Sequence, residues 1–148
     1  MRLFGLAASL LLIGSGAQAA SKAEPVQEII AAERAFAADT AVRGASSSFR
    51  AVVAPDAVGM FPDPATGILQ VASVKQRIES RPLVVKPSTI KWWPSFAGAA
   101  RSGEMGFTTG PVIYPEGRGQ GFIFTVWVKQ PDGNYLVEYD FVLPPERK

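Results

Sequence analysis

The helical patterns of this chain come early and its long strand patterns come late, and this order limits the folds open to it. Apolar residues recur at three- and four-residue spacing from Pro25 up to Gly44, which predicts a helix. Shorter helices are expected at 46–53 and 72–80, with a short strand at 57–61 and an apolar stretch at 68–71 between them.

The second half of the chain is rich in β-branched and aromatic residues. Strands are predicted at 89–97, 104–114, 121–130 and 134–143, and the Pro131-Asp132-Gly133 turn joins the last two as a hairpin. Helices followed by hairpin-linked strands predict an α+β fold with a mostly antiparallel sheet.

The N-terminus has the pattern of a signal peptide. Arg2 precedes an apolar run at 4–13, and Ala17-Gln18-Ala19 is a small-residue cleavage pattern. The apolar run is too short to span a bilayer, which takes roughly 20 residues. We therefore expect a signal peptide at 1–19, a tether at 20–24 and one domain at 25–148, with the mature protein periplasmic or secreted and free of the membrane.

The composition excludes several kinds of chemistry. The chain has no histidine and no cysteine, which removes imidazole bases, Ser-His and Cys-His nucleophiles and the usual zinc ligands. Neither a metal site nor a cofactor is expected, and acid–base chemistry would fall to carboxylates, tyrosine or lysine. After residue 19 the chain carries 14 Lys and Arg against 13 Asp and Glu, with no basic block, so nucleic acid is not an expected partner.

Glu33 is an acid on an apolar stripe. It lies four residues after Ile29 and three before Phe36, so it shares the helix face that is expected to be buried. Such a carboxylate needs a partner. It is either a pocket acid suited to proton transfer or a structural acid satisfied by Arg50 or by backbone amides of a nearby loop.

Asp140 lies on the last predicted strand, where the direction of its side chain is open. It shares one face with Glu138, whereas Tyr135, Val137, Tyr139 and Phe141 share the other. If the aromatic face points inward, both acids are on the outer surface. If the strand is bulged, or its other face looks inward, Asp140 becomes a pocket acid.

Aromatic residues on the central strands are the other candidates. Trp92 and Trp93 point to opposite faces, so one is expected inside and one outside. Trp127 and Tyr114 fit either the core, a dimer interface or a wall that stacks on a flat apolar ligand, to which Tyr114 would offer a hydroxyl.

Three segments carry motifs of a known kind. They are Ala32–Phe36 with Ala54–Val58; Trp93–Pro94 through Ser102–Pro111, which includes Gly-Phe-Thr-Thr-Gly-Pro; and Val126–Gly133, which includes Trp-x-Lys-Gln-Pro-Asp-Gly, with Asp140. Over about residues 25–143 the chain resembles the nuclear transport factor 2-like superfamily, which includes ketosteroid isomerase and the SnoaL-like cyclases, and within it a bacterial branch.

The resemblance implies a cone: a curved sheet wrapped around N-terminal helices, with a conical pocket between them. It also implies homodimers, often formed across the outer sheet face, and Asp140 matches the acid expected in this branch. It implies no single function, because the same fold serves enzymes, adaptors and binding domains. A dehydratase mechanism that relies on histidine is excluded.

Three functions remain. The leading hypothesis is a domain that binds a small apolar molecule, with Glu33 and Asp140 as polar contacts. The second is a cofactor-independent isomerase, lyase or cyclase that uses Asp140 or Glu33 for proton transfer and Tyr114 to assist. The third is a dimeric interaction module with a filled cone. The expected lining of the pocket is Phe36, Phe61, Trp92 or Trp93, Tyr114 and Trp127.

Overall fold

The computed structural model describes residues 24–115 and 119–143, and it confirms the α+β class. The expected signal peptide at 1–19, most of the tether and residues 144–148 of the expected domain lie outside the described residues. Within the described ranges, no helix is both long enough and apolar enough to cross a membrane. The elements are α1 (Pro25–Arg43), α2 (Ala45–Val52), β1 (Val53–Pro62), β2 (Leu69–Ser73), α3 (Val74–Glu79), β3 (Lys91–Trp92), β4 (Phe96–Ala99), β5 (Met105–Ile113), β6 (Gln120–Lys129) and β7 (Tyr135–Leu143).

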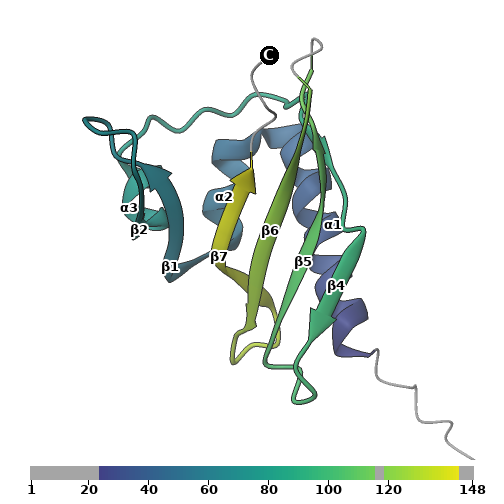
Figure 1. Cartoon of the computed structure of the whole chain (residues 1–148). Coiled ribbons are helices and arrows are strands. Elements are labelled where there is room, and N and C mark those ends of the chain that lie inside the picture. Colours follow the sequence, from purple (N-terminus) through teal and green to yellow (C-terminus); the bar gives the residue numbers. More distant parts are fainter. Residues whose placement is uncertain (1–23, 116–118, 144–148) are drawn as a thin grey trace, which may run out of the picture.

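The strands form one curved, open sheet in the order β2-β1-β7-β6-β5-β3, and β4 also pairs with β5. All of these pairs are antiparallel except β1 with β7, so the sheet is mostly antiparallel, as predicted. The helices lie behind the strands in Figure 1, and the face turned toward the viewer carries no helix. The concave side between α1, α2 and the sheet is therefore where a pocket can form.

Helix α1 turns one stripe toward the sheet. Its buried residues are Ile29, Glu33, Phe36 and Thr40, which follow each other at three- and four-residue spacing. The helix ends at Gly44, as the sequence predicts, with a φ of 87° that favours glycine. A Cβ at Gly44 would also lie 2.1 Å from the carbonyl oxygen of Lys86.

The prediction of one continuous strand at 89–97 is wrong. The structure has two short strands, β3 and β4, with residues 93–95 between them. Pro94 has no N–H to give to the ladder. The interrupted segment also comes so close to β5 that a Cβ on Gly110 would lie 2.0 Å from the carbonyl oxygen of Trp93. The strand predicted at 57–61 is longer than expected and starts at Val53.

Strand β7 contains a bulge that changes which of its side chains face inward. On β6, Val126 pairs with Tyr139 but the next residue, Trp127, pairs with Val137, so Glu138 is an extra residue on β7. Before the bulge Val137 is buried. After it Asp140 faces the concave side of the sheet. The alternation of the strand is therefore shifted by one residue at Glu138.

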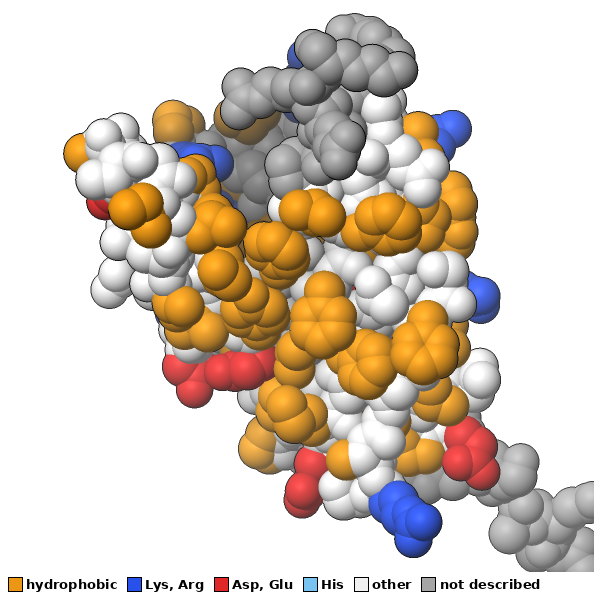
Figure 2. Space-filling model, in the orientation of Figure 1, with side chains coloured by type: hydrophobic (Ala, Val, Ile, Leu, Met, Phe, Trp, Pro, Cys, Tyr) orange, Lys and Arg blue, Asp and Glu red, His pale blue; other side chains and the backbone are white. Residues whose placement is uncertain are grey.

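The outer face of the sheet carries a row of aromatic side chains. The row runs across four strands through Phe96, Phe107, Phe124 and Tyr139, with ring centroids 5.8, 5.5 and 6.5 Å apart. Phe96 is 64 % exposed and Phe124 is 38 % exposed. Figure 2 shows apolar side chains gathered over the strands on this face. We call these four residues the outer aromatic row.

Candidate functional site

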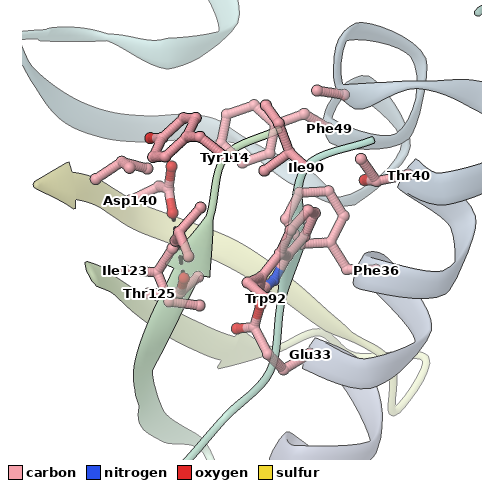
Figure 3. A pocket seen from close by; sticks show the side chains of 13 residues that line it. Glu33, Phe36, Thr40, Phe49, Ile90, Trp92, Tyr114, Ile123, Thr125 and Asp140 are labelled. Atoms are coloured by element: carbon pink, nitrogen blue, oxygen red, sulfur yellow. Dashed lines mark hydrogen bonds between the residues drawn. The ribbon is translucent and has the colours of Figure 1, made fainter. Parts of the chain in front are cut away.

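A cavity of about 200 Å³ lies between α1, α2 and the inner face of the sheet. Most of its wall is apolar, and the polar side chains in it come from α1 and from the central strands. Figure 3 shows Phe36 and Thr40 reaching it from the helix and Asp140, Ile123 and Thr125 from the sheet. The lining residues are Glu33, Phe36, Thr40, Ala45, Phe49, Ile90, Trp92, Val112, Tyr114, Ile123, Thr125, Asp140 and Val142.

Glu33 is fully buried at the inner end of this cavity and accepts three hydrogen bonds. The indole nitrogen of Trp92 donates to Oε1 at 2.6 Å, and that of Trp127 donates to Oε2 at 3.2 Å. The hydroxyl of Thr108 also donates to Oε2. All three donors are neutral, so Glu33 is satisfied by hydrogen bonds and not by an ion pair.

The expected partner Arg50 does not reach Glu33. Its guanidinium donates to the carbonyl oxygens of Ile78 and Arg81, at 2.7 and 2.6 Å, on the far side of α2 near α3. The loop amides proposed as the other partner are replaced by two indoles and a hydroxyl. Glu33 is thereby held in a fixed position, and both of its oxygens are occupied.

Asp140 reaches the cavity from β7 because of the bulge at Glu138. Of the two directions that the sequence left open for the Asp140 side chain, the structure therefore has the inward one, produced by a bulge. Burial is the main cause that raises the pKa of Asp140 to about 7. The hydrogen bond from the hydroxyl of Thr125, 3.1 Å from Oδ1, opposes this shift, and the charge of Glu33 adds to it.

Two threonines connect the surroundings of the two acids across the sheet. Thr108 on β5 pairs in register with Thr125 on β6, which pairs in register with Asp140 on β7. Both threonines are buried, and each donates to one of the carboxyl groups.

Over residues 24–115 and 119–143, no three acidic side chains gather closely enough to ligate a metal ion.

Thr40 adds a polar group on the opposite wall. Its side chain is fully buried, lines the cavity and points from α1 toward it in Figure 3. Its hydroxyl oxygen has no hydrogen-bond partner. Because a buried polar atom normally has a partner, this oxygen is suited to contact a bound molecule.

The aromatic candidates separate into three groups. Phe36, Trp92 and Tyr114 line the cavity. Trp127 is 1 % exposed and lies below it, in contact with Phe36 at 6.5 Å between ring centroids. The remaining two are outside it. Trp93 is 48 % exposed. Phe61, on β1, packs against a second buried cluster and has the guanidinium of Arg77 over its ring.

Several lining residues were not among the sequence candidates. Thr40 had a readable signal, because it continues the stripe of Glu33 and Phe36 by one more turn. Thr125 could have been found as the residue two before Trp127 on the same strand face. Phe49 and Ile90 come from α2 and from the segment before β3, and no periodicity marked them.

No protein-family model matches the chain, and no curated protein matches it. Among solved structures, it is similar to the designed nuclear transport factor 2-like protein Rd1NTF2, with 14 % identity, a TM-score of 0.50 and coverage of 78 % of this chain and 94 % of that one. It is also similar to a DUF4783 family protein from Bacteroides ovatus, with 15 % identity, a TM-score of 0.50 and coverage of 82 % and 99 %. At this identity the likeness shows the fold alone, which is the cone expected from the sequence.

Proposed function

We propose that this protein binds a small, mostly apolar molecule that carries a polar group, in the cavity between α1, α2 and the sheet. The observation that carries the proposal is the placement of Asp140 in an otherwise largely apolar wall. Apolar pockets with a few convergent polar groups are the usual form of small-molecule sites. The volume of about 200 Å³ limits the ligand to roughly one ring with a short substituent, since an apolar cavity of about 150 Å³ holds benzene.

Native mass spectrometry of protein purified from its own host tests this proposal. We expect a co-purifying mass that is lost from Ala45→Phe, because Ala45 lines the cavity and a phenyl ring there would fill its entrance. Ala51→Phe is the matched control, since Ala51 is also an exposed alanine of α2 but is not in the lining. A wild-type protein that carries no mass, and gains none when incubated with host extract, would contradict the proposal.

A second candidate is an enzyme that moves a proton, with Asp140 as the base and Tyr114 in the same wall. The observation that favours it is the pKa of Asp140, raised to about 7, because a general base works best with a pKa near the working pH. Incubation of the protein in deuterium oxide with the ligand that native mass spectrometry identifies distinguishes binding from catalysis. Deuterium uptake that Asp140→Asn abolishes supports the enzyme, whereas unchanged ligand supports binding alone.

We also infer that the protein is exported. The support is the sequence of the first 19 residues, with Arg2, the apolar run and the small residues at 17–19. Expression with residues 1–19 in a bacterial host is expected to give a periplasmic product that starts at Ala20, measured by intact mass. A full-length product in the cytoplasm would refute this inference.

A further inference from the structure

The charge of the cavity wall is of one sign. Glu33 and Asp140 are both in the lining, and none of the described residues that line the cavity is a lysine or an arginine. Glu33 already accepts three hydrogen bonds. Asp140 accepts one hydrogen bond, from the hydroxyl of Thr125 to Oδ1. None of the described residues donates a hydrogen bond to its other oxygen, Oδ2.

Within residues 24–115 and 119–143, the elements packed around Asp140 bring no cation to it. Helix α1 brings Glu33, the segment after β5 brings the phenol of Tyr114, and β6 brings the neutral Thr125. Strand β1, which pairs with β7, carries Asp56, whose charge acts on Glu138. Helix α2 carries Arg50, but one terminal nitrogen of its guanidinium donates to two backbone carbonyls, of Ile78 and Arg81, and the residue does not line the cavity. No positive charge is among the causes that shift the pKa of Asp140.

Aromatic rings make up much of the remaining wall. Phe36, Phe49, Trp92 and Tyr114 all line the cavity. Aromatic rings attract organic cations through their negative faces, and a desolvated site strengthens this attraction.

We propose that the ligand of this cavity is a small organic cation, a monocyclic or short-chain amine, whose ammonium group pairs with Asp140 while its apolar part contacts the aromatic wall. The inference rests on the proposed binding function and names the chemical class of the ligand. The ammonium supplies the positive charge that the wall lacks, and a buried carboxylate is costly until it is paired. An anionic ligand would meet two carboxyl groups and is excluded by the same argument.

Three probes with the same ring and different charge test the inference: benzylamine, benzyl alcohol and benzoate. Their binding to the full protein is followed by the NMR signals of the Trp92 and Trp127 indole N–H groups, at about pH 8, where Asp140 is mostly ionised. We expect benzylamine to bind about tenfold more tightly than benzyl alcohol, as a charge-assisted hydrogen bond allows, and benzoate not to bind. Equal binding of the amine and the alcohol, or preferred binding of benzoate, overturns the cation and leaves the binding function standing. If none of the three binds, the proposed function fails as well.

Substitutions and a change of pH test whether Asp140 causes the preference for the amine over the alcohol. Asp140→Asn is expected to abolish the tenfold preference for the amine, whereas Asp56→Asn, an exposed acid on the neighbouring strand, keeps it. In the wild type, the amine affinity should fall by about tenfold between about pH 8 and about pH 5, because protonation of Asp140 removes the charge. A preference that survives Asp140→Asn, or an amine affinity that does not change with pH, overturns the inference.

Discussion

The substitution Asp140→Asn should stabilise the protein at neutral and alkaline pH, although it removes a hydrogen-bonded side chain. Burial raises the pKa of Asp140 from 3.8 to about 7, so the folded protein holds this proton over a pH range in which the unfolded chain has released it. The free energy of unfolding therefore falls as the pH rises from about 4 to about 7, and it falls no further above that range. Asparagine cannot ionise, so the variant should not show this loss.

The size of the effect follows from the shift. A change of about three pKa units corresponds to about 4 kcal/mol as an upper limit. The carboxyl group borders a cavity that is partly open to solvent, and water there screens part of the cost. We therefore expect the free energy of unfolding of Asp140→Asn to be about 2 kcal/mol higher than that of the wild type at about pH 8. Near pH 4 the two values should be equal. The Thr125 hydroxyl can still donate to the amide oxygen of the new residue.

Urea unfolding, followed by tryptophan fluorescence at several pH values between about 4 and about 8, measures the difference. Asp56→Asn is the matched control, because Asp56 is exposed on β1 and its removal should leave the pH dependence parallel to that of the wild type. The reasoning is refuted if Asp140→Asn and the wild type lose stability in parallel as the pH rises. It is also refuted if the variant is the less stable of the two at about pH 8.

Three further substitutions test other parts of the structure. Glu33→Leu should lower the free energy of unfolding by about 2–4 kcal/mol in urea, because the indoles of Trp92 and Trp127 lose their shared acceptor; a cost near zero would contradict this. Thr40→Val should raise it by about 1 kcal/mol, since the unpartnered hydroxyl is replaced by a methyl group, and an equal loss would mean that the hydroxyl has a partner in solution. The outer aromatic row is expected to form the interface of a homodimer. Light scattering should therefore give twice the chain mass for the wild type and a lower mass for Phe124→Lys. A monomeric wild type would disprove this expectation.

The fold and one of the two acids could be predicted from the sequence because they depend on short-range patterns. The spacing of Ile29, Glu33 and Phe36 fixes which face of α1 is buried, and that face does pack on the sheet. The break between β3 and β4 was also present in the sequence as Pro94, within a run that otherwise favours a strand.

The partners of the acids could not be predicted, because they come from distant parts of the chain. Trp92 lies 59 residues after Glu33 and Trp127 lies 94 after it, so no local pattern links them. The position of Asp140 depended on the bulge at Glu138. This bulge is visible only when the pairing of β7 with β6 is known, because the amino-acid sequence of β7 alternates regularly through Glu138 and gives no sign of the extra residue.

The bulge at Glu138 means that β7 holds two alternative pocket walls in one sequence. With the extra residue, Asp140 faces the cavity and Tyr139 joins the outer aromatic row. If the part of β7 after Val137 slipped by one residue, so that no bulge formed, Glu138 would take the place opposite Val126. Tyr139 would then face the cavity opposite Thr125, and Asp140 would point to the outside, without any substitution. For this fold, a shift of one residue in strand register is therefore a change of chemistry, and related chains are best compared by their strand pairing and not by aligned sequence alone.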